Sequence, residues 1–198
     1  MERNNLFPVF LKLEELATLL VGGGNVGLEK LAAILKNSPG ANVTVVAGFI
    51  CEPIKELANS HPTVKLIERN FSDDDLLDVD LVILATDNKE LHVEVRESAR
   101  MKRLLINVAD TPDLCDFYLG AVVTKGNLKI GISTNGKSPT IAKRIREYLE
   151  DALPDDTNAL LENMRSIRDK MKGDFNEKVR TLNEITSSWL TKKDKDQE

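Results

Sequence analysis

The sequence predicts an α/β fold in which a parallel β-sheet is followed by a β-hairpin with a helix and then by a small C-terminal helical domain. Up to residue 108, short apolar stretches alternate with helical patterns, which is typical of βαβ units and a parallel sheet. Two strand-like stretches then meet at a tight turn. In the remainder, apolar residues recur every three or four positions, as they do in helices.

The sheet is expected to contain five strands, because five apolar stretches are short and continuous, as in strands buried on both faces. They lie at 16–21, 43–46, 64–67, 81–85 and 104–108. Helices are expected between them at 28–35, 54–58 and 89–101, where the apolar residues have helical spacing. Right-handed crossovers would join the strands.

The second half predicts different elements. A hairpin is expected at 121–133 around Lys125-Gly126, and a helix is expected to begin at Ser138 and Pro139. Apolar residues from Leu160 to Trp189 predict two helices separated at Gly173-Asp174, and the tail TKKDKDQE is expected to be disordered. The predicted domains are 1–113, 114–151 and 152–198.

Composition narrows the class of protein. The net charge of −5 over 198 residues gives no bulk attraction to nucleic acid or to a membrane surface. No apolar stretch approaches the ~20 residues of a membrane span, and the first residues lack the pattern of a secretory leader. Cys51 and Cys115 form no metal-type cluster, so reduced thiols in a cytoplasmic protein are expected.

The stretch LLVGGGNVGLEK at 19–30 predicts a dinucleotide site. Gly22, Gly24 and Gly27 match the G-x-G-x-x-G pattern, which supplies a tight turn, a close approach to a pyrophosphate and tight packing of helix on strand. The N–H groups of the helix that begins at Asn25 and Val26 would face the phosphates. Together with the strand before it and the helix after it, this turn predicts a Rossmann-type domain.

The end of the second strand does not decide between NAD and NADP. An acid is expected there to bind the adenosine ribose, but the strand ends at Ala47 and Gly48, and no arginine follows for a 2′-phosphate. Backbone groups near Ala47 and Phe49 are therefore the candidates for binding the ribose. Thr86, Asp87 and Asn88 follow the fourth strand, where such sheets bind ligands. Their alternative role is to cap the next helix.

The fifth strand contains Asn107, a candidate cofactor contact, and ends just before Asp110, a carboxylate that would face the nucleotide crevice. Its alternative role is that of a turn residue ahead of Pro112.

A polar loop follows the hairpin. It is either a helix cap or an anion site, and its candidate residues are Thr134, Asn135, Gly136, Lys137 and Ser138. The basic residues around this loop suggest a polycarboxylate ligand: Lys125, Lys129, Lys137, Lys143, Arg144 and Arg146.

In five segments taken together, the chain resembles the precorrin-2 dehydrogenase and sirohydrochlorin ferrochelatase family, the siroheme synthases, over about residues 5–155. The segments are LLVGGGNVGLEK, VTVVA, VILATDNKELH, INVADTPDLCDF and ISTNGKSPTIAKRIREYLE. Two departures are Leu119-Gly120-Ala121, where the family often has a Pro-Ala pair, and Asp116 in place of an Asn. At these positions the resemblance predicts neither the conformation of the local backbone nor the polar contact of the family's Asn.

The resemblance implies an NAD-binding domain, a dimerisation region formed by the hairpin and the following helix at about 117–151, and a cleft completed by the second subunit of a homodimer. It implies that NAD⁺ takes a hydride from the tetrapyrrole precorrin-2 to give sirohydrochlorin, with Asp110 as general base. Insertion of Fe²⁺ or cobalt is left open. No metal ligands are assigned, because His61 and His92 are expected to be structural or surface residues. Thr134 lies where some relatives carry a regulatory serine in the site, so it is a candidate wall residue of the site and a candidate for phosphorylation.

Three rival functions remain at this point. The first is an NAD-binding regulatory or sensor domain without catalysis. The second is a chelatase with a vestigial nucleotide fold, which the intact glycines oppose. The third is a structural protein that oligomerises through the 160–189 stripe, which the central break at Gly173 opposes.

Overall fold

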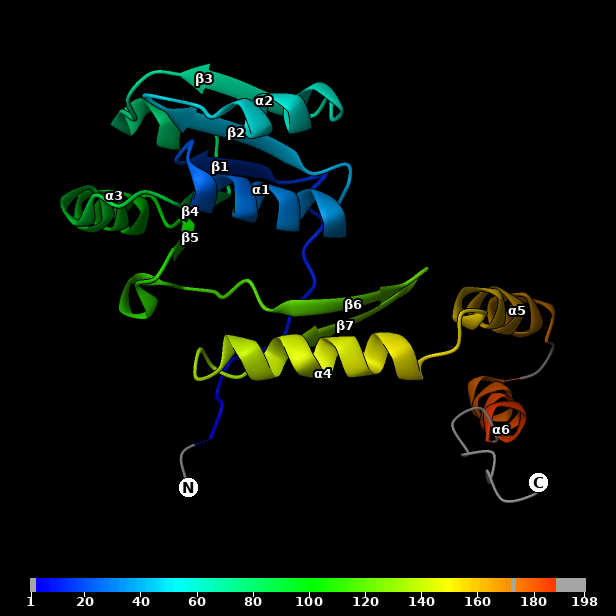
Figure 1. Cartoon of the computed structure of the whole chain (residues 1–198). Coiled ribbons are helices and arrows are strands. Elements are labelled where there is room, and N and C mark those ends of the chain that lie inside the picture. The colour runs from blue at the N-terminus through cyan, green and yellow to red at the C-terminus, as the bar shows by residue number, and fades with distance from the viewer. Residues whose placement is uncertain (1–2, 172–173, 188–198) are drawn as a thin grey trace. The chain divides into compact units, whose positions relative to one another are not determined.

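A five-stranded parallel sheet forms the N-terminal part of the computed structural model, which describes residues 3–171 and 174–187 (Figure 1). The strand order is β3-β2-β1-β4-β5, and all four neighbouring pairs are parallel. The strands are β1 Ala17–Val21, β2 Asn42–Ala47, β3 Val64–Glu68, β4 Leu81–Leu84 and β5 Leu105–Val108. The predicted α/β class and the five strands are confirmed, with ends that shift by a residue or so.

Helices cover both faces of this sheet (Figure 1). Side chains of α1 (Asn25–Asn37) and α2 (Glu52–Asn59) pack on one face, and those of α3 (Lys89–Met101) pack on the other. Each face of the sheet has its own core cluster, because the strands are apolar on both faces, as their unbroken apolar stretches predict. Helix α1 begins at Asn25, before the predicted start at Leu28, because Asn25 and Gly27 interrupt the apolar pattern in its first turn.

Two short 3-10 helices, η1 (Asp73–Leu76) and η2 (Pro112–Leu114), complete this part. Both lie outside the elements predicted from sequence, because three or four residues are too few to produce a periodic pattern. Asn88 caps α3: its Oδ1 accepts the N–H groups of Glu90 and Leu91 at 3.0 and 3.1 Å.

The predicted hairpin and helix follow, as β6 (Ala121–Lys125), β7 (Leu128–Ile132) and α4 (Pro139–Ala152). Gly126 lies in the hairpin turn with a φ of +58°, a conformation that suits glycine. Ser138 caps α4, since its Oγ accepts the Ile141 N–H at 3.2 Å. The last helices are α5 (Thr157–Lys170) and α6 (Phe175–Thr186). Gly173, Trp189 and the predicted disordered tail lie outside the described residues.

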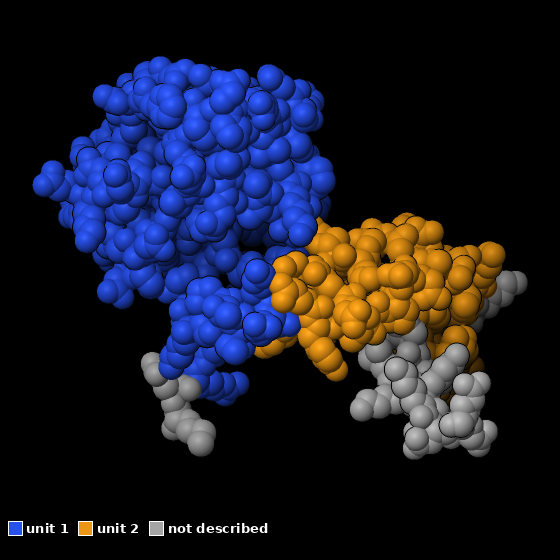
Figure 2. Space-filling model, in the orientation of Figure 1, with its two compact units in different colours: residues 1–122, 131–144 blue, residues 123–130, 145–198 orange. Residues whose placement is uncertain are grey.

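The chain divides into two compact units, residues 1–122 with 131–144 and residues 123–130 with 145–198 (Figure 2). In the second unit the hairpin tip is fixed to the start of α5: Asn158 Oδ1 accepts the Asn127 N–H at 2.9 Å, and Lys125 Nζ lies 2.6 Å from Asp155 Oδ1. The three-domain division from the sequence stays a prediction. Within the described ranges, no helix is long and apolar enough to cross a membrane.

Candidate active site

The glycine turn lies between β1 and α1, and its three motif glycines differ in their surroundings. A Cβ on Gly22, whose φ is +132°, would lie 2.2 Å from the Ala85 carbonyl oxygen. A Cβ on Gly27 would lie 2.2 Å from the Gly22 carbonyl oxygen. A Cβ on Gly24 would meet nothing within 4 Å. The first and third glycines therefore allow close packing, whereas the second leaves open space beside the backbone, as a nucleotide-binding turn requires.

The N-terminus of α1 is suited to an anion. Its N-cap residue, Gly24, supplies no side-chain hydrogen bond, and Gly24, Asn25 and Val26 are exposed while Gly22 and Gly27 are buried. The first N–H groups of a helix have no acceptor within it, and the helix dipole adds a partial positive charge. This end of α1 can therefore receive a pyrophosphate through its backbone.

Gly23 stands at the first variable position of the G-x-G-x-x-G motif, but the structure requires a glycine there. A Cβ there would lie 2.0 Å from the Phe49 carbonyl oxygen, and the Gly23 carbonyl accepts the Cys51 N–H at 2.9 Å. The glycine turn is thereby fixed against the loop after β2. The run of three consecutive glycines was the signal that could have revealed this third close contact.

The carboxyl ends of β2, β1, β4 and β5 meet around this turn. The Gly22 N–H donates to the Val46 carbonyl oxygen at 3.0 Å, and the Ala109 N–H donates to the Leu84 carbonyl oxygen at 2.9 Å. Ala47, the ribose candidate, ends β2 and is buried. The candidates at these strand ends therefore belong to one edge of one sheet, the edge at which such sheets bind ligands.

After β4, Asn88 caps α3, so Thr86 and Asp87 have no capping role. The cofactor role of Thr86 and Asp87 stays a prediction. Thr86 is half-buried, and its carbonyl oxygen and its Oγ1 both lie 3.0 Å from His92 Nε2. Asp87 is exposed. His92 is buried and His61 lies 2.9 Å from a main-chain carbonyl of α2, so both histidines have structural contacts.

Asp110 lies two residues beyond β5, at the position equivalent to Thr86 beyond β4, because Leu84 and Val108 are register partners. It is exposed, with a φ of +55°. This left-handed conformation is uncommon for residues other than glycine, although Asp and Asn tolerate it best. Asn107 is buried within β5 and its amide donates to the Phe117 carbonyl at 2.8 Å. The cofactor role of Asn107 stays a prediction.

Cys115 supports the turn that presents Asp110. Its Sγ accepts the Val108 N–H at 3.2 Å and lies 3.3 and 3.4 Å from the carbonyl oxygens of Val108 and Thr111. Burial raises the pKa of the Cys115 thiol, which keeps it neutral and able to donate. Cys51 is likewise a free, partly buried cysteine.

Asp116, one of the two departures from the family pattern, anchors the segment after this turn. Both oxygens of its carboxylate face the Arg96 guanidinium, with one contact at 2.8 Å. Asp116 also exchanges two hydrogen bonds with the backbone of Ile106 in β5, at 2.8 and 3.1 Å. The Arg96 hydrogen bonds and the Ile106 N–H together hold the pKa of Asp116 below its ordinary value.

Replacing Asp116 with Asn is expected to lower the free energy of unfolding by about 1 kcal/mol at pH 7, a value that allows for solvent screening of a side chain 28% exposed. Because the pKa of Asp116 is lower in the folded state, its ionised carboxylate stabilises the protein at pH values above the unfolded pKa of 3.8. This stabilisation is lost as the pH falls through the folded pKa. The difference between the two proteins should therefore shrink as the pH falls below 3.8 and vanish at a pH below the folded pKa of Asp116. Urea unfolding at both pH values measures this, with Asp113→Asn as control. An equal difference at both pH values would refute the ionic contribution.

The candidate substrate loop is closed by its own hydrogen bonds. Thr134 Oγ1 accepts the Ser138 N–H at 3.2 Å and donates to the Ser138 carbonyl at 3.1 Å, while the Lys137 N–H donates to the Thr134 carbonyl at 3.0 Å. Asn135 and Gly136 have φ values of +54° and +73°. The capping role of Ser138 is thus present. The substrate and phosphorylation roles of this loop stay predictions.

Carboxylates of this chain pair with two of the basic residues that the sequence places around this loop. Arg146 lies 2.9 Å from Glu150, one turn further along α4, and Lys125 pairs with Asp155. A tetrapyrrole carboxylate would have to compete with these internal partners at both positions. The clustering of basic residues in the sequence therefore overstates the positive charge available to a ligand.

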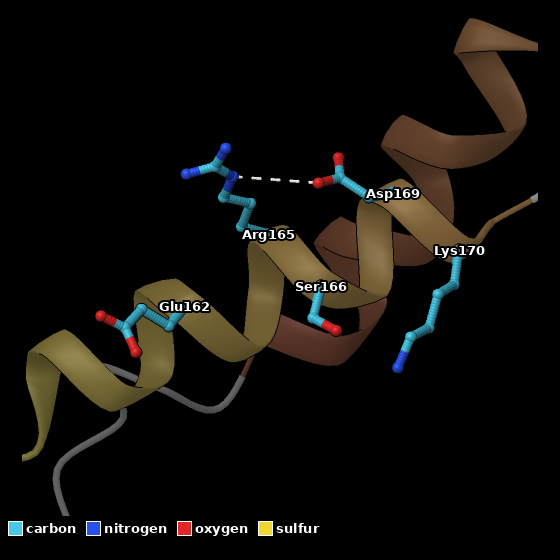
Figure 3. A pocket seen from close by; sticks show the side chains of 5 residues that line it. All are labelled: Glu162, Arg165, Ser166, Asp169 and Lys170. Carbon is cyan, nitrogen blue, oxygen red and sulfur yellow. Dashed lines mark ion pairs between the residues drawn. The ribbon is translucent and has the colours of Figure 1, made fainter.

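A shallow depression on the second unit is unrelated to these residues (Figure 3). All of its lining comes from the single helix α5, so it has no opposite wall. Arg165 and Asp169 form an ion pair at 3.8 Å across it. Its lining residues are Glu162, Arg165, Ser166, Asp169 and Lys170.

Comparison with known proteins agrees with this geometry. A family model described as putative NAD(P)-binding matches residues 9–121, and one described as the central part of a sirohaem biosynthesis protein matches residues 125–152. The siroheme synthase of Psychrobacter cryohalolentis is 36% identical over 185 residues, which are 93% of this chain and 34% of that protein. The chain belongs to the siroheme synthase family of putative NAD(P)-binding proteins.

Other relatives in the siroheme synthase family agree. The siroheme synthase of Methylococcus capsulatus is 34% identical over 83% of this chain and 34% of its own length. The chain thus spans about a third of the curated relatives it matches. The solved structure named SirC, precorrin-2 dehydrogenase, is 25% identical with a TM-score of 0.74, and the match covers 94% of this chain and 93% of that one. The whole fold of this siroheme synthase family member, and not only its nucleotide-binding domain, therefore has a counterpart in SirC.

Proposed function

We propose that this protein oxidises precorrin-2 to sirohydrochlorin with NAD⁺ as the hydride acceptor. The observation that carries the proposal is the match to SirC along nearly the full length of both chains. The open space at Gly24 and the uncapped start of α1 fit a dinucleotide. The carboxylate of Asp110 at the same sheet edge adds a group able to take a proton.

The residues divide the chemistry as follows. The glycine turn and the N-terminus of α1 hold the pyrophosphate through backbone N–H groups. Bound NAD⁺ supplies the site that accepts a hydride. Asp110 acts as the general base and takes the proton that leaves the macrocycle, so a hydride and a proton are removed together. The 134–138 loop and nearby cations orient the carboxylates of the tetrapyrrole.

The test is an anaerobic assay with purified protein, enzymatically prepared precorrin-2 and NAD⁺, without added metal. The proposal requires NADH and sirohydrochlorin to accumulate together over many turnovers. A regulatory sensor would bind NAD⁺ and leave precorrin-2 unchanged, which would refute the dehydrogenase. Fe²⁺ added afterwards tests chelation separately. The described residues contain no group of three or more His, Cys, Asp or Glu able to hold a metal ion.

We propose further that the protein is a homodimer through α4. Ile141, Ile145 and Tyr148 follow one stripe of this helix, and each is at least 40% exposed. Large apolar side chains in a contiguous exposed stripe are typical of an interaction surface. A two-fold partner would bury the same stripe of both copies.

Replacing Ile145 with Glu is expected to convert the dimer to a monomer in sedimentation experiments, because a buried charge without a partner is strongly unfavourable. The control is Lys143→Glu, which introduces the same side chain about 200° around the helix and should leave the dimer intact. A monomeric wild-type protein, or an Ile145 variant that remains a dimer, would refute this interface.

A further inference from the structure

A carboxylate reaches the ribose edge of the sheet from the neighbouring strand. Strand β2 ends at Ala47 without the acid that usually binds the ribose. Glu68 is the register partner of Ala47 and ends β3. Its Oε1 accepts the Ile50 N–H at 3.0 Å. The side chain therefore crosses from β3 to the loop after β2, where the adenosine ribose of a dinucleotide lies in such folds.

Carboxylates hold two of the cations at this edge. Lys55 Nζ on α2 lies 3.2 Å from Glu68 Oε2. Arg69, directly after β3, directs its guanidinium at both oxygens of Asp75, with one contact at 2.8 Å. The Asp75 side chain is only 7% exposed and also accepts the Ser72 N–H at 2.9 Å, so this ion pair is firmly placed. The Ile50 N–H and Lys55 lower the pKa of Glu68, which keeps it ionised.

An uncharged polar group lies at the same edge. A Cβ on Gly48 would lie 2.5 Å from Asn70 Oδ1, so the Asn70 amide is packed against the residue that follows β2. An amide and backbone groups suit a ribose with a free 2′-hydroxyl, which donates and accepts hydrogen bonds. A 2′-phosphate needs cations instead, and Lys55 and Arg69 are already paired.

We propose that Glu68, acting together with Lys55, determines the choice of cofactor and selects the dinucleotide with a free 2′-hydroxyl, NAD, over NADP. The carboxylate repels a 2′-phosphate directly. It also holds the ammonium group that would otherwise bind that phosphate. This inference rests on the proposed function only in assuming that the glycine turn binds a nicotinamide dinucleotide.

A purely structural role for Glu68 makes a different prediction. If the side chain only supports the loop after β2 through Ile50, then removing its charge should affect NAD⁺ and NADP⁺ equally. The variant Glu68→Gln separates the two roles, because the amide oxygen still accepts the Ile50 N–H while the negative charge is gone.

The experiment is isothermal titration of NAD⁺ and NADP⁺ into the full chain. In Glu68→Gln the Kd for NAD⁺ should stay within about twofold and the Kd for NADP⁺ should fall about fivefold, the size of an exposed charge interaction. Lys55→Gln should shift the ratio of the two Kd values in the opposite direction, because Glu68 then loses its counter-ion. Both shifts should shrink at high salt. Glu56→Gln removes a negative charge from the exposed side of α2 and should leave the ratio unchanged.

The outcomes separate this inference from the proposed function. Parallel changes for both nucleotides, or equal ratios in the Glu68 and Glu56 variants, would overturn the role of Glu68 while NAD⁺ binding stands. If Glu68→Gln does not fold, the Lys55 variant alone decides, and an unchanged ratio in it overturns the inference. Failure of wild-type protein to bind either nucleotide would overturn the proposed function and the inference together.

Discussion

Replacing Asp110 with Asn is expected to lower kcat for precorrin-2 oxidation by about 10²- to 10⁴-fold, the usual contribution of a general base, while the Kd for NAD⁺ changes by less than about twofold. The amide has the shape of the carboxylate but cannot take a proton. Asn also tolerates the left-handed conformation at this position, where φ is +55°. Steady-state turnover and calorimetric NAD⁺ binding on the same preparation measure both quantities.

The matched control is Asp113→Asn, the same chemical change three residues further along in an exposed part of η2. It should retain wild-type turnover. If the Asp110 variant also turns over at the wild-type rate, the proton is taken by another group and the assignment of Asp110 is wrong. If neither the wild type nor either variant oxidises precorrin-2 although all bind NAD⁺, the sensor function is favoured.

The second large effect is expected at the glycine turn, where Gly24→Ala and Gly27→Ala should differ in their effects on stability and on NAD⁺ binding. Gly24→Ala should lower the free energy of unfolding by no more than about 1 kcal/mol, the preference for Gly over Ala at an N-cap, since its Cβ meets no atom within 4 Å and its φ of −93° is ordinary. It should nevertheless weaken NAD⁺ binding tenfold or more, because the methyl group takes the space into which the pyrophosphate approaches the backbone. Thermal unfolding and NAD⁺ titration together measure this separation.

Gly27→Ala should behave in the opposite way. Its Cβ would lie 2.2 Å from the Gly22 carbonyl oxygen, a backbone atom that cannot move aside. We expect a loss of about 1–3 kcal/mol in stability, as for overpacked cores. Unimpaired NAD⁺ binding by Gly24→Ala would show that the open space beside Gly24 is not the pyrophosphate site. Normal stability of Gly27→Ala would contradict the packing role.

The elements that the sequence predicted well are those with a repeating apolar pattern. The strands of the parallel sheet are buried on both faces, so each is a continuous apolar stretch, and α3 is bounded by the same residues, Lys89 and Met101, in sequence and structure. The glycine turn could also be predicted, because the spacing of its glycines between a strand and a helix is visible in the sequence. A pattern along the chain was enough in both cases.

The contacts that depend on distant partners could not be predicted. Arg96 and Asp116 are 20 residues apart, and Glu68 meets the Ile50 N–H across 18 residues, so no spacing rule links them. The basic residues near the 134–138 loop are an intermediate case. Their cluster was visible in the sequence, and Glu150 stands at helical spacing from Arg146, but Asp155, the partner of Lys125, is identified only by the fold.

The most direct test of the central claim follows the hydride itself. Precorrin-2 that carries deuterium on the ring carbon to be oxidised would be incubated anaerobically with the protein and NAD⁺, and the nicotinamide product would be examined by NMR and mass spectrometry. Our account predicts one deuterium on the nicotinamide ring for each sirohydrochlorin formed. Sirohydrochlorin that forms while the deuterium enters water, or without reduced nicotinamide, would contradict it.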